Sequence, residues 1–360
     1  MAAGAAPTPP MAPTESPRYL LRIAQHPDPT RIGRVRELCA GERLVLGRGA
    51  DAFGADGLLD PRMSRSHARL VALREGLQVE DLGSRNGTLV GGRSVGIADL
   101  ESGDLIGLGQ VLIQVSRLPD LAEPAPAPAP LQASSPAMWP LRRALQEARG
   151  VVGPRLVVGE AGSGRRTLAR ALHPLLGRRG PLVELRLAGI VDDALEASLH
   201  GEQRDPGSSA LARARGGSLL LPDLDLASPA ARAMIARLAA DPPAEVQLLI
   251  TATRGAGLPG VQRFDLPPLR ARREDILPLA RQLASRAAGH SVQLDRLLAM
   301  HLDLHAWPGN VAELSEIMRR LVQEQPGAEI LEMPGWGLEL LGRRALGSET
   351  TFDPSLLDPP

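Results

Sequence analysis

A run of alternating proline and alanine divides this chain into two parts with different sequence patterns. Residues 123–130 read Glu-Pro-Ala-Pro-Ala-Pro-Ala-Pro. Proline lacks the backbone N–H that helices and inner strands use, so such a run forms a semi-stiff, extended spacer. We therefore expect a linker over residues 119–136, with an independently folded part on each side of it. The chain has 360 residues, so each part is long enough to bury its own core.

The two parts differ in the period of their apolar residues. Over residues 18–118, short apolar stretches are separated by Gly, Asp and Asn at hairpin-like spacing, which predicts an all-β sandwich. Over residues 137–323, apolar strands alternate with helical segments, which predicts an α/β domain with a small helical lid at about 273–323. Residues 1–17 have the composition of a disordered arm, and residues 324–360 that of an irregular tail.

Composition and charge exclude several classes of protein. The chain has 41 basic and 41 acidic residues, without the basic excess of a nucleic-acid-binding protein. It has neither a run of apolar residues long enough to cross a membrane nor a recognisable signal peptide, so we expect a cytoplasmic protein. A single cysteine excludes a multi-cysteine metal cluster, and we expect no metal site. Other proteins are the expected partners.

Three segments of the first part carry candidate binding residues, namely residues 46–48, 63–68 and 81–88. They read Leu-Gly-Arg, Met-Ser-Arg-Ser-His-Ala and Asp-Leu-Gly-Ser-Arg-Asn-Gly-Thr. In this order and spacing they resemble the forkhead-associated (FHA) domain family over residues 18–118. The resemblance implies that the first part binds phosphothreonine in partner proteins.

The resemblance also implies a role for individual residues. Arg48 and Arg65 would hold the phosphate together with the hydroxyl of Ser64, and Asn86 would hold the backbone of the ligand. The chemistry agrees, because a phosphate dianion needs charge-assisted donors and the arginine guanidinium presents a planar fork of them.

Three further residues complete the predicted pocket. In this family the residue at the position of His67 braces the loop, and Gly87 permits the positive φ of the turn. Arg85 departs from the family, which commonly has a small hydroxylated residue there, so Arg85 either adds charge to the pocket or crowds it. The alternative is a β-sandwich whose loops carry arginine and serine by chance.

The second part contains a glycine-rich loop between a predicted strand and a predicted helix. Four segments resemble the AAA+ domain of sigma-54-dependent activators, namely residues 135–138, 159–173, 266–276 and 307–314. The resemblance implies a nucleotide-binding loop that cradles phosphates with backbone N–H groups. The residues at its nucleotide-binding positions are Gly159, Gly162, Gly164, Arg165, Arg166 and Asp223.

Several positions of the nucleotide site depart from the family. Arg165 replaces the lysine that reaches the outer phosphates, and Pro222-Asp223 replaces the Asp-Glu pair for magnesium and water. Arg254 stands where an asparagine is expected, and Ala312 where a sensor arginine is expected. The chain also lacks the GAFTGA loop that grips sigma-54, and it has too few residues before Leu266 for an arginine-finger helix. The sequence lacks lysine altogether, so coding bias explains the change at Arg165 but not the others.

These departures predict that the second domain is not an enzyme and has no catalytic residues. No cofactor is then required, although weak binding of ATP with Mg²⁺ through the loop stays open. We expect a phosphothreonine-dependent signalling adaptor whose AAA+ domain is an inactive scaffold that packs against other proteins, AAA+ homologues among them. The alternative is an ATP-dependent transcriptional activator acting on sigma-54 RNA polymerase. The prolines and glycines of the tail leave no room for a helix-turn-helix, so we expect no sequence-specific DNA binding.

The tail contains a short motif, Glu349-Thr350-Thr351, that resembles the Glu-Thr-Thr site phosphorylated by Ser/Thr kinases in some small bacterial FHA regulators. One hypothesis is that phosphorylated Thr350 or Thr351 docks onto Arg48 and Arg65. An ordinary polar tail is the other interpretation, because motifs of this length arise by chance.

Overall fold

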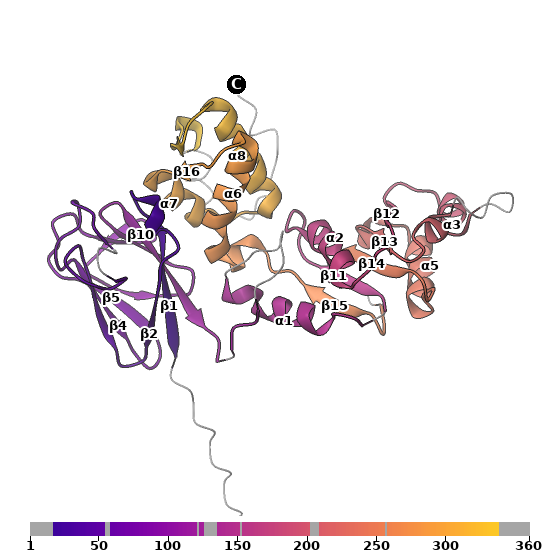
Figure 1. Ribbon diagram of the computed structural model, residues 1–360, viewed down its shortest axis with the longest axis horizontal. Coiled ribbons are helices and arrows are strands. Elements are labelled where there is room, and N and C mark those ends of the chain that lie inside the picture. Colours follow the sequence, from indigo (N-terminus) through magenta and orange to yellow (C-terminus); the bar gives the residue numbers. More distant parts are fainter. Residues whose placement is uncertain are drawn as a thin grey trace, which may run out of the picture. The chain divides into compact units, whose positions relative to one another are not determined.

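The computed structural model describes residues 17–54, 58–120, 122–125, 135–151, 153–201, 209–255 and 258–337. The chain splits into two compact units, with the division between Ala122 and Glu123 (Figure 1). Among the described residues, no helix has the length and apolar character needed to cross a bilayer. Thr350 and Thr351 lie outside the described residues.

The first unit is a sandwich of two antiparallel sheets. One sheet has the order β2-β1-β10-β9-β6-β7 and the other β3-β4-β5-β8. The strands are β1 Arg18–Gln25, β2 Val35–Cys39, β3 Arg43–Leu46, β4 Ala68–Ala72, β5 Leu77–Asp81, β6 Thr88–Val90, β7 Arg93–Val95, β8 Ile97–Leu100, β9 Leu105–Leu108 and β10 Val111–Leu118, with a 3₁₀ turn η1 at Pro29–Arg31.

The core of the sandwich explains why this sequence forms strands. Leu70 and Val79 are fully buried and are Cα partners across β4 and β5, while the residues beside them in each strand are partly exposed. Leu21, Ile23 and Ile113 supply the facing side of the same core from the other sheet. A side-chain period of two with one buried face is the pattern of a sandwich. The predicted fold of this part is confirmed.

The second unit contains a five-stranded parallel sheet of order β12-β13-β14-β11-β15. The strands are β11 Arg155–Val158, β12 Leu182–Glu184, β13 Ser218–Leu221, β14 Gln247–Ala252 and β15 Gln262–Asp265. The helices are α1 Trp139–Glu147, α2 Arg165–Leu175, α3 Asp192–His200, α4 Ala210–Arg213 and α5 Pro229–Ala240, with 3₁₀ turns η2 Pro136–Met138, η4 Leu224–Leu226, η5 Leu269–Ala271 and η6 Arg273–Asp275.

Both faces of this sheet are buried. In β13, Leu219 and Leu221 join a cluster with Ile235 of α5, whereas Leu220 between them joins the cluster that contains Leu168 of α2. Strands buried on both faces read as continuous apolar runs, which is how residues 218–221 appear in the sequence. The predicted α/β fold is confirmed.

Three helices and a two-stranded ribbon form the lid. They are α6 Ile276–Ala288, β16 Gln293–Leu294, α7 Arg296–Leu304, α8 Asn310–Glu324 and β17 Ile330–Leu331. The lid therefore continues past residue 323, where the sequence predicts an irregular tail. Gly327 takes a positive φ of 76° in the turn after α8, and β17 then pairs with β16, burying Leu331.

Part of the predicted linker packs onto the second unit. The Arg142 side chain of α1 is buried, and its Nη1 lies 3.1 Å from Glu123 Oε1. The same guanidinium also donates to the carbonyls of Pro124 and Ala125. Residues 126–134, which contain most of the proline–alanine run, lie outside the described residues.

Candidate functional site

Two loops of the first unit are joined through their backbones. Arg48 N–H donates to the Ser64 carbonyl at 3.1 Å, and Gly49 N–H donates to the Arg65 carbonyl at 3.2 Å. Gly47 makes this approach possible, because a Cβ on Gly47 would lie 2.2 Å from the Arg65 carbonyl oxygen. The loop after β3 and the loop before β4 thus bring Arg48, Ser64 and Arg65 together.

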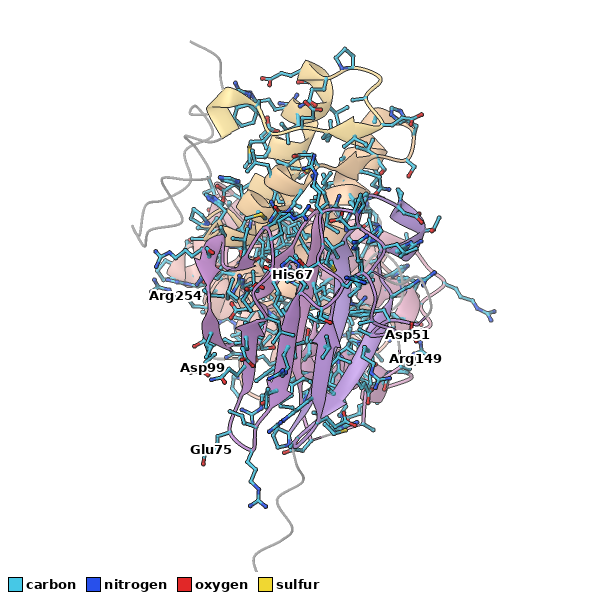
Figure 2. The ribbon with its side chains drawn as sticks, turned by 90° about the vertical axis from the view of Figure 1, so that its left-hand side faces the viewer. Asp51, His67, Glu75, Asp99, Arg149 and Arg254 are labelled. Atoms are coloured by element: carbon cyan, nitrogen blue, oxygen red, sulfur yellow. The ribbon has the colours of Figure 1, made fainter. Side chains whose placement is uncertain are left out.

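His67 connects this pair of loops to a third one. The ring is fully buried within the sandwich (Figure 2), and its Nδ1 accepts the Ser64 N–H at 3.1 Å. The proton must then sit on Nε2, which donates to the Gly87 carbonyl at 3.1 Å. Gly87 has a φ of 73°. This geometry is that of a brace, the role that the FHA resemblance implies for His67.

The third loop contributes Arg85 and Asn86. Arg85 N–H donates to Ser64 Oγ at 3.2 Å, so the hydroxyl proton of Ser64 can point to a ligand. Asn86 Nδ2 donates to the Arg62 carbonyl at 2.6 Å. The Asn86 side chain is exposed, so its Oδ1 can accept a hydrogen bond from a ligand. The sequence did not single out Arg62, because its contribution is a backbone carbonyl that any residue could supply.

Asp81 holds the third loop in shape. Its Oδ2 accepts from the N–H groups of Gly83 and Ser84, and its Oδ1 accepts from the hydroxyls of Ser84 and Thr88. Burial raises the pKa of Asp81, but these hydrogen bonds outweigh it and hold the pKa below its ordinary value. The loop is therefore organised around a carboxylate that stays ionised at neutral pH.

The glycine-rich loop of the second unit runs from Gly159 to Gly164, between β11 and α2. Gly162 and Gly164 have φ values of 73° and 106°, a conformation that other residues rarely adopt. A Cβ on Gly159 would lie 2.8 Å from the Leu266 carbonyl oxygen, so this end of the loop also requires glycine. The three predicted glycines thus shape one turn at the N-terminus of α2.

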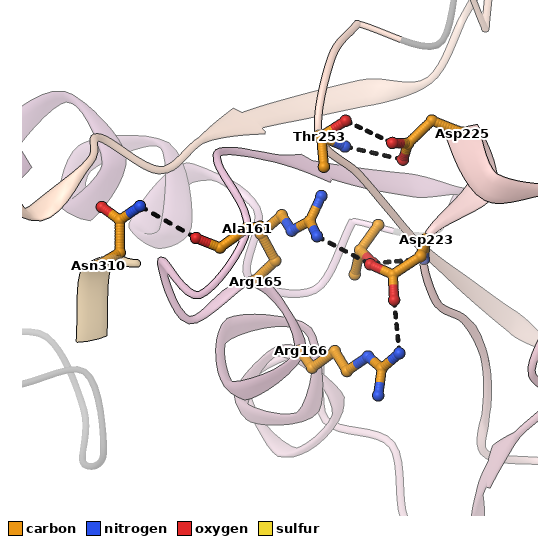
Figure 3. A network of polar contacts seen from close by, with 8 residues as sticks. Ala161, Arg165, Arg166, Asp223, Asp225, Thr253 and Asn310 are labelled. Carbon is orange, nitrogen blue, oxygen red and sulfur yellow. Dashed lines mark hydrogen bonds and ion pairs between the residues drawn. The ribbon is translucent and has the colours of Figure 1, made fainter. Parts of the chain in front are cut away.

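Arg165 and Arg166, the first two residues of α2, share one carboxylate (Figure 3). Arg165 Nη2 lies 2.9 Å from Asp223 Oδ1, and Arg166 Nη2 lies 2.5 Å from Asp223 Oδ2. Arg165 and Asp223 are largely buried, with side chains 9% and 13% exposed. Asp223 has a positive φ of 54°, and its N–H donates to Thr251 Oγ1 at 2.9 Å.

Comparison with known proteins accounts for both units. The FHA domain family matches residues 30–109, the Sigma-54 interaction domain family residues 131–241, and the AAA+ ATPase lid domain family residues 270–333. The chain joins an FHA domain to a sigma-54-type AAA+ domain.

Relatives of the AAA+ domain include transcriptional regulators. The DNA-binding transcriptional regulator NtrC of Rhizobium meliloti (strain 1021) is 30% identical over 261 residues, which cover 62% of this chain and 54% of NtrC. The transcriptional regulatory protein ZraR of Klebsiella oxytoca is 34% identical over 236 residues, covering 54% and 53%. The chain therefore spans about half the length of these curated relatives.

The FHA domain also has similar solved structures. One of them, from a "Structural and functional analysis of phosphothreonine-dependent FHA domain interactions", is 32% identical. The match covers 28% of this chain and 98% of that chain, with a TM-score of 0.25.

The lid of the AAA+ domain binds the glycine-rich loop directly. The buried Asn310 side chain accepts the Leu269 N–H at 2.8 Å and donates to the Ala161 carbonyl at 3.0 Å and to Glu160 Oε2 at 3.1 Å. Ala312 N–H donates to the Gly162 carbonyl at 3.2 Å. A Cβ on Gly162 would lie 2.2 Å from the Gly309 carbonyl oxygen, so loop and lid are in close contact.

Arg270 reinforces this junction through Glu160. Arg270 Nη1 lies 2.8 Å from Glu160 Oε2, and Arg270 Nη2 lies 2.5 Å from Glu160 Oε1. The hydrogen bonds from Arg270 lower the pKa of Glu160 and outweigh the opposing effect of its burial. Arg272, which is almost fully buried, adds a hydrogen bond of 2.8 Å to the Ser163 carbonyl.

A second carboxylate near the loop was missed by sequence reasoning. Asp225 Oδ1 accepts the Thr253 N–H at 2.9 Å, and its Oδ2 accepts the Thr253 hydroxyl (Figure 3). Burial raises the pKa of Asp225, but the bonds from Thr253 outweigh it and lower the pKa overall. The signal was the second acidic residue of Asp223-Leu224-Asp225, directly after an apolar strand. Arg254, the residue at the expected asparagine position, is exposed.

These contacts bear on whether a nucleotide with magnesium suits the site. Pro222 is buried and has no side-chain ligand for a metal. The oxygens of Asp223 are bound by two guanidinium groups, and those of Asp225 by Thr253. The residues present therefore do not fit a magnesium-bound triphosphate, and we derive no hydrolytic step from them.

Proposed function

We propose that this chain is a phosphothreonine-dependent signalling adaptor, in which the FHA domain captures phosphorylated proteins. One observation carries the proposal. The backbone bonds between residues 48–49 and 64–65 bring Arg48 and Arg65 together, and both side chains are exposed. Within the described part of the chain, no ion pair joins either guanidinium to a carboxylate. Two such groups beside the Ser64 hydroxyl suit a phosphate dianion.

The test is a pulldown of the full chain with a phosphothreonine peptide library. Arg48→Ala should remove binding, and treating the peptides with phosphatase should have the same effect. Arg74→Ala is the matched control, because Arg74 is exposed and lies beside Glu75 at the end of the sandwich away from His67 (Figure 2). Equal capture by the native protein and Arg48→Ala would contradict the proposal.

The same proposal requires two partners, namely a Ser/Thr kinase that phosphorylates the threonine and a phosphoprotein that carries it. Phosphorylated Thr350 or Thr351 is one candidate ligand, in the same chain or in a neighbouring one. Treating the purified chain with a Ser/Thr kinase, followed by mass spectrometry, tests it. The candidate is lost if neither threonine gains a phosphate.

We propose further that the AAA+ domain is an inactive scaffold rather than an ATPase. The supporting observation is that Arg165 and Arg166 are both bound to Asp223. In an active site of this kind a lysine reaches the phosphates and a carboxylate holds the metal. Here Pro222 stands at the metal position, the Asp223 carboxylate at the following position is engaged by two cations, and Gly162 is in contact with the lid. Such a domain would serve the adaptor as a binding surface for other proteins, AAA+ homologues among them.

The second candidate function is ATP-dependent activation of sigma-54 RNA polymerase. The match of residues 131–241 to the Sigma-54 interaction domain favours it. Release of phosphate from ATP with Mg²⁺ separates the two candidates. We expect none above background from the native chain, and none from Arg165→Lys, because that change leaves Pro222 and Ala312 in place. Magnesium-dependent turnover by the native chain would favour the activator.

A further inference from the structure

Four arginines, rather than two, lie on the loops that form the phosphothreonine pocket proposed above. Besides Arg48 and Arg65, the joined loops contain Arg62 and Arg85, and all four side chains are exposed. Among the described residues, no ion pair engages any of the four. Elsewhere in the same domain Arg31 pairs with Asp28 and Arg69 with Glu80. Other exposed arginines of the described domain, such as Arg74, also lack an ion pair, so what sets the four apart is their place on the joined loops.

The backbone contacts tie the two additional arginines to different parts of the pocket. The N–H of Arg85 donates to the hydroxyl oxygen of Ser64, which places Arg85 beside the predicted phosphate position. The carbonyl of Arg62 accepts from the side chain of Asn86, which places Arg62 beside the predicted position of the ligand backbone. The backbone of each arginine is therefore hydrogen-bonded to a residue that the FHA resemblance assigns to ligand binding.

Two of the nearby carboxylates are engaged elsewhere. Asp60 is buried, and its oxygens accept the N–H groups of Arg62 and Gln110 at 3.0 and 2.5 Å. Asp81 is bound by the amides and hydroxyls of its own loop. These contacts shape the loops and do not neutralise the guanidinium groups by direct pairing.

We infer that Arg62 and Arg85 select phosphothreonine segments that carry further negative charge directly beside the phosphothreonine. The inference rests on the proposed phosphothreonine binding and specifies its ligand. A phosphothreonine supplies a charge of up to −2, whereas four guanidinium groups supply +4. Carboxylates or a second phosphate next to the phosphothreonine would balance the remaining positive charge of the guanidinium groups. A neutral flanking sequence would leave that charge unpaired.

Three peptides of one sequence test this on the full chain by fluorescence anisotropy. The first has phosphothreonine with neutral neighbours, the second has acidic neighbours, and the third has a second phosphothreonine beside the first. The native chain should bind the second, the third or both more tightly than the first, by on the order of tenfold at low salt. The difference should shrink in high salt, because exposed charges are screened.

The variants assign the effect to the two arginines. The double change Arg62→Gln with Arg85→Gln should reduce the preference to about twofold, because it lowers the affinity for the acidic and doubly phosphorylated peptides more than the affinity for the neutral peptide. Lysine at both positions should restore most of the preference because it restores the charge. Arg74→Gln is the control for a lost positive charge elsewhere on the domain. All three positions are exposed, so the variants should fold.

The outcomes separate this inference from the function on which it rests. If the native chain binds all three peptides equally well, or if the double variant keeps the preference, the inference is overturned while phosphothreonine binding stands. If none of the peptides binds in an Arg48-dependent manner, phosphothreonine binding itself fails and takes the inference with it. A preference for the doubly phosphorylated peptide alone would support the inference with a second phosphate as the source of charge.

Discussion

Arg165 Nη2 lies 2.9 Å from Asp223 Oδ1, and this ion pair joins the start of α2 to the residue that follows Pro222. The two residues are 58 positions apart in the sequence. The pair lies at the glycine-rich loop of the AAA+ domain, and Arg166 binds the other oxygen of the same carboxylate.

Removing the shared carboxylate should destabilise the AAA+ domain. In Asp223→Ala the Arg165 guanidinium stays largely buried without a counter-charge, and we expect a loss of about 3 kcal/mol in the free energy of unfolding. The matched control is Asp265→Ala, which breaks the exposed pair with Arg263 and should cost less than about 1 kcal/mol. Chemical denaturation of the full chain measures both. Equal losses in the two variants would show that burial of the Asp223 pair has no special weight.

The contact between lid and loop should depend on Asn310. Asn310→Ala leaves the Leu269 N–H and the Ala161 carbonyl without their partner, at a cost of about 3 kcal/mol. Asn310 also has a positive φ of 55°, which alanine tolerates poorly. Asn310→Gly should therefore be less damaging than Asn310→Ala by about 1 kcal/mol. The ranking of the two variants in thermal unfolding checks the effect of the positive φ, and the reverse order would contradict it. Native stability in both variants would contradict the hydrogen-bond account.

Two neighbouring glycines of the FHA domain should respond differently to alanine. A Cβ on Gly47 would lie 2.2 Å from the Arg65 carbonyl oxygen, whereas the nearest atom to a Cβ on Gly49 is 3.4 Å away. Gly47→Ala should separate the two loops and weaken phosphopeptide binding more than about tenfold. Gly49→Ala should stay within about twofold of the native affinity. Titration with one phosphothreonine peptide measures both, and similar affinities for the two variants would refute the loop geometry.

Phosphopeptide binding should weaken in mild acid while the FHA domain stays folded. The second pKa of the phosphate is about 6, so lowering the pH from about 7.5 to about 5.5 should reduce affinity about fourfold. The pKa of Asp81 lies below its ordinary value of 3.8, so its stabilising effect is present above that value and is lost only as the pH falls through its lowered pKa. Circular dichroism should therefore stay constant between about pH 7.5 and about 4.5. Loss of structure over the same pH range as loss of binding would contradict this.

The sequence predicts the two folds because their signals are local. The three segments of the FHA domain lie within residues 46–88, and each one shapes a single loop, so the FHA resemblance that they carry could place Arg48, Ser64 and Arg65 in one pocket. The glycines at 159, 162 and 164 likewise mark a turn between a strand and a helix. Glycine is required at these three positions by the backbone geometry of the turn, and a short stretch of residues determines that geometry.

Other contacts could not be predicted because they join residues that meet only in the folded domain. The sequence places Asp223 at the position of the catalytic glutamate, but the approach of Arg165 and Arg166 depends on where α2 starts relative to β13. The bond from Thr253 to Asp225 joins two segments that follow neighbouring strands. The return of the chain through Gly327 to pair β17 with β16 was also missed, since two residues are too few for a strand pattern.

Asn310 bridges three segments of the AAA+ domain at once, namely residues 160–161, residue 269 and the start of α8. Core and lid are thus joined by groups of the protein itself. We expect these contacts to set the orientation of the lid, so that it stays the same whatever the ratio of ATP to ADP in the cell. A partner protein that binds to core and lid together would then meet a surface of constant shape.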